Sequence, residues 1–134
     1  MVKRNWMIFV GVMILIFASV ACEFSASTAN IGDAWLSDSE DGGNRVTTFS
    51  QDAVFYAFAD LKNAPEDTTL KAVWIAVDVE GVDPNFVINE TEFTSGSNII
   101  TFNLSNNNLW PVGKYRVEIY LNGKLDKTLD FEVR

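Results

Sequence analysis

The 134-residue sequence has no histidine, a single cysteine and few positive charges. Histidine is the commonest general base and metal ligand, so its absence argues against most hydrolytic and metal-dependent chemistry. One cysteine excludes an internal disulfide, so the core alone must hold the fold together. Ten lysines and arginines stand against 18 aspartates and glutamates, a net charge of −8. Because nucleic-acid binding needs a basic stripe, this balance argues against nucleic acid as a partner.

The first 21 residues differ from the rest of the chain. Lys3 and Arg4 precede a continuous apolar stretch over residues 6–17, which is followed by small residues at 18–21. A positively charged segment, followed by an apolar stretch and then by residues with small side chains, is typical of an export signal. The only cysteine, Cys22, comes directly after it.

The placement of this cysteine resembles the bacterial lipoprotein signal, in which a lipobox precedes an obligatory cysteine. Ala21 and Cys22 match that pattern, whereas Ser19 stands where an aliphatic residue is usual. The resemblance implies cleavage after residues 1–21, a diacylglycerol on the Cys22 thiol and a further acyl chain on its amine. Lipid would then anchor the protein to a membrane of the bacterial cell envelope, with the domain on the extracytoplasmic side.

Two other outcomes stay open at this stage. Residues 19–21 also satisfy the small-x-small rule of ordinary signal peptidase cleavage, which would give a secreted domain with a free thiol. Alternatively, the segment stays uncut as a signal anchor, although about 16 apolar residues are short for a span of roughly 20. All three outcomes place the domain outside the cytoplasmic membrane.

The remainder of the chain is predicted to be all-β. Small polar residues after Cys22 predict a flexible tether over residues 22–30. From residue 31 onward, short β-type runs alternate with turn clusters, and no sustained 3.6-residue apolar period indicates a long helix. Residues 31–134 are therefore predicted to form one antiparallel sandwich of about seven to eight strands. The predicted strands cover residues 31–37, 45–49, 53–61, 69–79, 86–93, 98–104, 114–121 and 127–133.

The last two predicted strands alternate apolar and polar residues on either side of Asn122-Gly123. A two-residue turn would place Tyr115 opposite Asp130, so that apolar residues of one strand would lie opposite acidic residues of the other along the whole hairpin. A three-residue loop with left-handed Gly123 would instead pair Tyr115 with Leu129. We therefore expect the three-residue loop.

Two features resemble immunoglobulin-like sandwiches. Residues 109–115 (LWPVGKY) resemble the tyrosine corner, in which a tyrosine at the start of the penultimate strand hydrogen-bonds a backbone group a few residues earlier. Trp74 stands where such domains often keep a core tryptophan. Residues 31–134 thus resemble an immunoglobulin-like or fibronectin III-like domain, without the cysteine pair of the antibody type. Such domains are common in envelope lipoproteins and host many functions.

One predicted strand favours a binding surface. Residues 71–79 are apolar on both faces, so an inward Trp74 leaves a valine–isoleucine row facing outward. The strand expected beside it, residues 114–121, adds an arginine and a tyrosine, which are typical interface anchors. The predicted partner-binding patch consists of Val73, Ile75, Arg116 and Tyr120. The alternative is that the row is buried, by an inward Ile75 or by a covering loop.

The acidic segments give weaker signals. Residues 38–44 (DSEDGGN) gather oxygen ligands, but Gly42 stands at the fifth position, where the calcium loop of EF-hands needs an acid. An acidic, solvated turn fits better, and we expect no metal and no cofactor. Paired carboxylates alone can hydrolyse glycosides, but a small sandwich offers little cleft, so we expect no enzymatic activity.

The sequence thus predicts a non-enzymatic, lipid-anchored interaction module whose partner is an envelope or extracellular protein. One alternative is a protease inhibitor that inserts residues 38–44 or 81–85 into a protease cleft. A third, less favoured, is an enzyme that acts on envelope polysaccharide through two carboxylates.

Overall fold

A computed structural model of the chain describes residues 28–134. The predicted signal segment, Cys22 and most of the predicted tether lie outside these residues. Within residues 28–134 we find no helix with the length and apolar character needed to cross a membrane.

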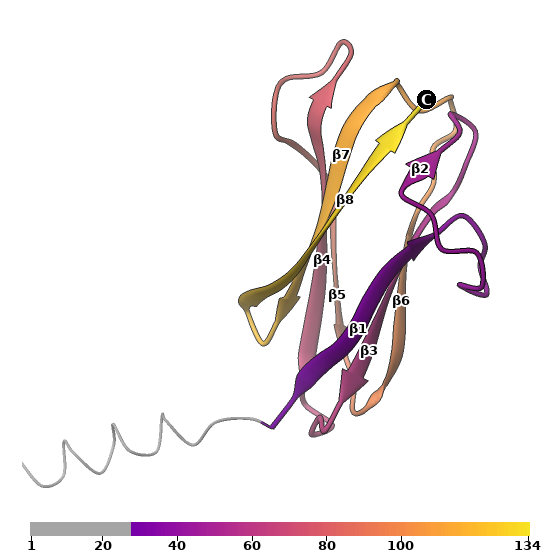
Figure 1. The fold of residues 1–134 in the computed structure, drawn as a ribbon. Coiled ribbons are helices and arrows are strands. Elements are labelled where there is room, and N and C mark those ends of the chain that lie inside the picture. The colour runs from indigo at the N-terminus through magenta and orange to yellow at the C-terminus, as the bar shows by residue number, and fades with distance from the viewer. Residues whose placement is uncertain (1–27) are drawn as a thin grey trace, which may run out of the picture.

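In the described part of the chain, eight strands form two sheets that pack face to face (Figure 1). One sheet has the order β1-β3-β6 and the other β2-β8-β7-β4-β5. All neighbours are antiparallel except β2 and β8, which are parallel. The strands are β1 (Asn30–Ser37), β2 (Thr48–Phe49), β3 (Phe55–Lys62), β4 (Thr69–Val79), β5 (Phe86–Thr94), β6 (Asn98–Leu104), β7 (Gly113–Leu121) and β8 (Lys124–Val133). The predicted all-β sandwich is confirmed.

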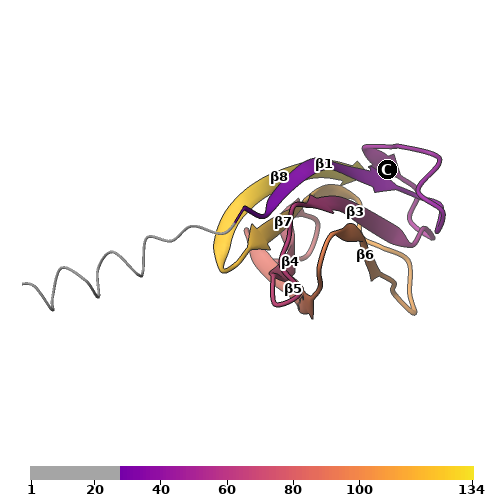
Figure 2. The same cartoon turned by 90° about the horizontal axis from the view of Figure 1, so that it is seen from below.

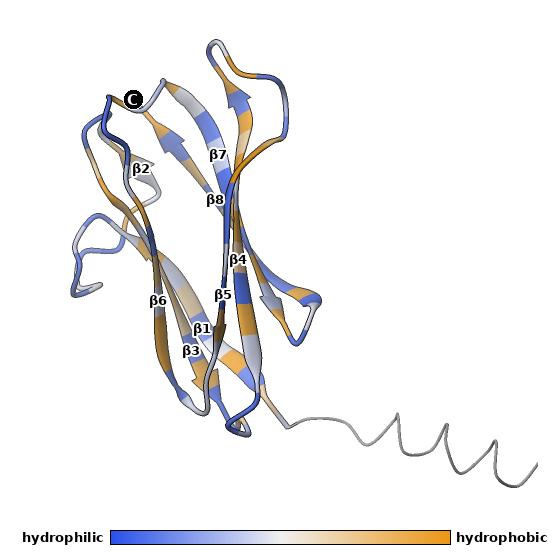
Figure 3. Ribbon diagram, turned by 180° about the vertical axis from the view of Figure 1, so that it is seen from behind, coloured by the Kyte–Doolittle hydropathy of each residue, from blue (hydrophilic) through white to orange (hydrophobic). Residues whose placement is uncertain are grey.

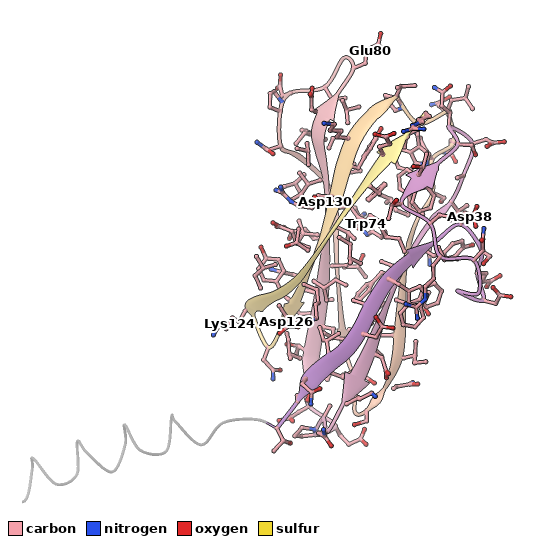
Figure 4. All side chains as sticks on the ribbon, viewed as in Figure 1. Asp38, Trp74, Glu80, Lys124, Asp126 and Asp130 are labelled. Atoms are coloured by element: carbon pink, nitrogen blue, oxygen red, sulfur yellow. The ribbon has the colours of Figure 1, made fainter. Side chains whose placement is uncertain are left out.

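The core between the sheets is rich in aromatic rings. Trp74 is 1% exposed and lies between the sheets (Figure 4), which confirms the predicted core tryptophan. Phe55 stands at the centre of the cluster, with its ring centroid 4.5 Å from that of Trp110. The rings of Phe49 and Phe131 each lie 4.9 Å from it in edge contacts. Buried aromatic area of this kind supplies much of the stability of a domain without disulfides.

The tyrosine corner is also confirmed. The Tyr115 hydroxyl donates to the carbonyl oxygen of Pro111 at 2.6 Å, from the third residue of β7 back to the preceding loop. Burial raises the pKa of Tyr115 to about 12, so the hydroxyl keeps its proton. The β6–β7 loop is thereby tied to the core.

The β7–β8 hairpin differs from its prediction. The turn has two residues, not three: Leu121 pairs with Lys124, and Asn122 and Gly123 both have positive φ, of 49° and 81°. The extra residue that restores the apolar alternation is Asp126, which forms a bulge between the pairs on either side of it. Tyr115 consequently pairs with Phe131 rather than with Leu129.

The two ends of the sandwich carry different segments. β1 begins at one end, which we call the β1 end, where the Thr28 hydroxyl donates to the Asn63 carbonyl at 2.7 Å. The opposite end, which we call the far end, carries the loops at residues 80–85 and 105–112 together with the C-terminus, whereas the loop that follows β1 lies at the side of the sandwich (Figure 1). Seen from below, β1 and β8 lie on one side of the sandwich and β5 and β6 on the other (Figure 2).

Candidate functional site

The predicted patch is brought together on the outer face of β4 and β7. Ile75 pairs with Arg116 in register, and Val73 pairs with Glu118. However, Val73 is only 5% exposed and Ile75 only 6%. The prediction that these two side chains are exposed is therefore wrong, and whether this face binds a partner stays a prediction.

Long side chains of the flanking strands bury the valine–isoleucine row. Glu118 is the centre of this cover: its carboxylate lies 3.4 Å from Arg116 Nε and accepts a hydrogen bond of 3.1 Å from the Tyr120 hydroxyl. That bond is the main reason why the pKa of Tyr120 is raised. Lys71 Nζ lies 4.7 Å from the centre of the Tyr120 ring. The face is therefore an apolar row under a connected polar layer.

The acidic loop at residues 38–44 packs against its own sandwich. The Trp35 indole nitrogen donates to the Gly42 carbonyl at 3.1 Å, and the Trp35 ring stacks on Phe58. The pKa of Asp41 is lowered because its carboxylate accepts hydrogen bonds from the Gly43 amide and the Ser39 hydroxyl. In the described part of the chain, no group of three or more His, Cys, Asp or Glu side chains is placed to hold a metal ion.

Two carboxylates share an open groove of about 430 Å³ beside β2 and β8. Asp130 and Glu132 line it together with Lys114 and Arg134. Glu132 accepts a hydrogen bond from Arg134 Nε, and Asp130 pairs with Arg116 in the β7–β8 register. Each carboxylate thus has a cationic residue beside it.

A different feature appears at the far end, between the β4–β5 and β6–β7 loops. It is an apolar crevice of about 110 Å³, lined almost entirely by apolar atoms, and its lining includes Phe86 and Ile88 near the start of β5. Trp110 and Tyr115 form its inner wall. The lining residues are Ala76, Val79, Val82, Phe86, Ile88, Asn106, Trp110, Pro111 and Tyr115.

The surroundings of this crevice, which we call the far-end crevice, are also apolar. Phe86, in its lining, is 52% exposed. Leu109 and Val112, which flank the lining residues Trp110 and Pro111 in the facing loop, are 62% and 44% exposed. Figure 3 shows the hydrophobic segment where the chain enters β5. Exposed apolar side chains gathered around a concave apolar surface are typical of protein contact sites.

Sequence reasoning missed this crevice because it is formed by two loops far apart in the chain. A signal was nevertheless present. Apolar residues continue directly after the turn at Pro84 and Asn85, and Leu109 and Val112 flank Trp110 in a segment that is not a strand. Binding residues are found disproportionately on loops, so exposed apolar side chains in a loop can indicate a contact site.

Several solved structures share this fold at low sequence identity. An immunoglobulin-like protein from Pseudomonas aeruginosa matches with a TM-score of 0.54 and 15% identity, over 82% of this chain and 99% of that one. An alkylpurine DNA glycosylase from Pseudomonas fluorescens, solved bound to DNA that contains an abasic site analogue, matches with a TM-score of 0.53 and 12% identity. A β-glucosidase from Listeria innocua matches with a TM-score of 0.51 and 12% identity.

These matches define the class of the domain as an immunoglobulin-like β-sandwich, as predicted. Each covers 82% of this chain, but the chain spans only 31% of the glycosylase and 17% of the glucosidase. At such identities the likeness concerns the fold alone, because one sandwich architecture hosts many functions. No protein-family model matches the sequence, and no curated protein sequence matches it.

Proposed function

We propose that this protein is a lipid-anchored, non-enzymatic interaction module that holds an immunoglobulin-like sandwich outside the cytoplasmic membrane of a bacterium. The observation that carries the proposal is the position of the only cysteine, Cys22, directly after the predicted export signal and six residues before Thr28 at the β1 end. Six residues span at most about 20 Å, so an anchor on Cys22 keeps the β1 end near the membrane.

The far end would then face away from the membrane. β4 has 11 residues, and at a rise of about 3.3 Å per residue it extends roughly 36 Å. The far-end crevice would therefore be displayed to envelope or extracellular proteins, well clear of the lipid surface. This arrangement suits a module in which lipid supplies the location and the sandwich supplies the surface.

The proposal is tested by the intact mass of the full chain, expressed in a bacterium and extracted with detergent. We expect a protein that begins at Cys22 and is heavier than its peptide by two or three acyl chains. Cys22→Ser should lose the added mass and the membrane association, whereas the matched control Ser25→Ala should keep both. An unmodified 22–134 peptide in the soluble fraction, or retention of Met1, would overturn the lipid anchor.

The absence of catalysis is part of the proposal and needs its own test. The carboxylates that share a groove have cationic neighbours, and the far-end crevice has almost no polar lining. Purified protein incubated with envelope polysaccharide should release no new reducing ends. Release that disappears in Asp130→Asn or Glu132→Gln would instead establish the polysaccharide-acting enzyme.

Protease inhibition is the second candidate, favoured by one observation. The loop over residues 80–85 projects beyond the ends of its strands, with Glu80 outermost (Figure 4). Gly81 and Asn85 both have positive φ, which gives the loop a defined turn at each end. Inhibition of extracellular proteases that is lost in Asp83→Ala but kept in Asp38→Ala would establish this function.

A further inference from the structure

We propose that the far-end crevice docks one apolar side chain of a partner protein, presented on a segment that has lysine or arginine on both sides. The inference rests on the proposed function, because it names the surface and the partner chemistry through which the anchored module would bind. Three properties of the crevice carry it: size, rigidity and charge.

The size of the crevice selects a single side chain. Small-molecule sites usually enclose about 300–1,000 Å³. The crevice holds about 110 Å³, and its lining is apolar almost throughout. Such a space suits one leucine-sized group, and the exposed rims at Phe86 and Leu109 can pack around the backbone that carries it. Side chains that fill well-packed, desolvated pockets near the centre of an interface carry much of its binding energy.

The walls of the crevice are fixed before any partner arrives. The Trp110 backbone amide donates to the Gln51 carbonyl at 2.7 Å, and its indole nitrogen donates to the Ala53 carbonyl at 2.9 Å. The two loops that face each other are joined by a hydrogen bond of 3.3 Å from the Glu80 amide to the Val112 carbonyl. Because little has to be ordered on binding, even a modest contact area can hold a partner.

The charge of the rim selects the flanks of the anchor. The β4–β5 loop, residues 80–85, carries Glu80 and Asp83 next to the lining residues Val79 and Val82, and neither this loop nor the one at residues 105–112 contains a lysine or arginine. Both carboxylates are exposed. Basic residues beside the anchor would be steered toward this rim, whereas acidic ones would be repelled.

A second copy of this chain offers similar chemistry but the wrong geometry. Leu125, between Lys124 and Asp126 with Lys127 beyond, is 45% exposed near the β7–β8 turn. Figure 4 shows Lys124 and Asp126 near the lower part of the sandwich and Glu80 at its opposite end. Copies anchored in one membrane would hold these two surfaces at different heights, so a different protein is the proposed partner.

The test uses the full chain as extracted, labelled with ¹⁵N, in phosphatidylcholine nanodiscs if it is lipidated and in buffer if it is not. The probes are three synthetic heptapeptides: a central leucine flanked on each side by lysines, the same peptide with glutamates, and the lysine peptide with alanine for leucine. We expect saturable amide shifts at Val82, Phe86 and Ile88 with the lysine–leucine peptide. Binding should weaken by about tenfold or more for either of the other peptides.

Matched variants locate the site. Phe86→Asp and Leu109→Asp should each abolish the shifts, while the amide spectrum stays dispersed because both side chains are largely exposed. Ile99→Asp is the control, since Ile99 is as exposed as Phe86, at 52%, but lies on β6 away from the crevice. Equal binding of the glutamate peptide, shifts that map elsewhere, or no saturable shift at all would overturn the inference.

Two further results separate the alternatives. Self-association of the full chain that is lost both in Leu125→Asp and in Phe86→Asp would show that a second copy fills the crevice, and would overturn the proposed partner. The mass measurement reads lipidation without reference to the crevice. A lipidated protein that binds no peptide would therefore leave the anchored module standing without this site, and an unlipidated one that binds would leave the site without the anchor.

Discussion

Gly42 and Gly81 have nearly the same backbone conformation but very different surroundings. Their φ angles are 72° and 77°, in the left-handed region that disfavours side chains. A Cβ on Gly42 would lie 2.9 Å from the Phe58 ring, which is buried under the loop at residues 38–44, whereas a Cβ on Gly81 would meet nothing within 4 Å. The pair therefore separates backbone strain from steric overlap.

We expect Gly42→Ala to lower the free energy of unfolding by about 2–4 kcal/mol, as strain and overpacking add. Gly81→Ala should cost only about 1–2 kcal/mol, from the strain alone. Urea denaturation followed by tryptophan fluorescence measures both. Equal losses in the two variants would mean that Phe58 moves aside freely and that the loop does not depend on this close approach.

The tyrosine corner makes a prediction about stability. Tyr115→Phe keeps the buried ring but removes the donor to the Pro111 carbonyl, so it should cost about 1–2 kcal/mol. Tyr120→Phe removes a hydroxyl bonded to Glu118 on the outer face, and should cost less than about 0.5 kcal/mol. Denaturant midpoints of the two variants test this, and a larger loss for Tyr120→Phe would contradict it.

The same residue predicts a pH dependence. The pKa of Tyr115 is about 12 in the folded protein against 10.0 for an ordinary tyrosine. The folded state holds this proton more tightly, so the stabilisation is complete below pH 10 and is lost as the pH rises from 10 toward 12. Unfolding midpoints measured from pH 8 to 12 should fall more steeply for the unmodified protein than for Tyr115→Phe. Parallel curves would show that Tyr115 does not contribute.

Single residues also show where sequence reasoning stops. The inward position of Trp74 and the hydrogen bond of Tyr115 could be predicted, because each depends on a strand face or on a local motif. The burial of Val73 and Ile75 could not, because it depends on the length and pairing of side chains on neighbouring strands, Glu118 above all. Alternation tells which face a residue occupies, but not what covers that face.

Among the elements, the β7–β8 hairpin shows how one structural need can be met in two ways. For the apolar residues of β7 and β8 to lie on the same face, one residue between Leu121 and Phe131 must be left out of the pairing. The sequence prediction placed that residue in the turn. The structure places it at Asp126, so that Asn122 and Gly123 can form a turn with two positive φ angles. Asn122 is held further by Thr69, whose amide donates to its side-chain oxygen at 3.0 Å.

The bulge predicts an asymmetry between two single-residue deletions. Deleting Asp126 should leave every other pair of the hairpin in place, at a cost below about 1 kcal/mol. Deleting Glu118, from the middle of β7, cannot be absorbed by that bulge, because it reverses the face of Val117 or of Ile119 against β4 or breaks the pairing. It should cost at least about 3 kcal/mol. Denaturation midpoints decide, and similar losses in both variants would show that the bulge is not a spare residue.

Long strands were easier to predict than short ones. β4 and β6 match their predicted ranges, whereas the strand predicted over residues 45–49 shrinks to Thr48–Phe49 plus a bridge between Arg45 and Ser37. β2 has only two residues, which pair in parallel with β8, and so short a strand shows no alternation of apolar and polar residues that could be detected. Their position depends on the completed sheet rather than on local sequence.

At the scale of the whole molecule, net charge should limit stability. The chain carries a net charge of −8. Such self-repulsion favours the expanded state and is weakened by salt. Raising NaCl from about 0.02 to 0.5 M should therefore raise the thermal midpoint by roughly 2–4 °C. A Glu40→Gln/Asp83→Asn double variant should respond less. A flat or falling midpoint in the unmodified protein would contradict the expectation.

The arrangement of the molecule as a whole was predictable only in part. Eight β-type runs and a tyrosine corner were enough to predict the sandwich. The far-end crevice depends on how the β4–β5 loop and the β6–β7 loop meet, through the bond between Glu80 and Val112. Contacts between two loops are determined by tertiary packing, and the sequence of either loop alone does not predict them.

The direction of β1 has a mechanical consequence. β1 begins at the end where the proposed lipid tether attaches, runs toward the far end and pairs with β3 through seven register positions. If a membrane pulls on Asn30 while a partner holds the far-end crevice, the force acts along β1 rather than across it. The ladder is then loaded in shear, so its hydrogen bonds share the tension instead of opening one after another. A module built in this way resists unfolding when the surfaces it connects move apart.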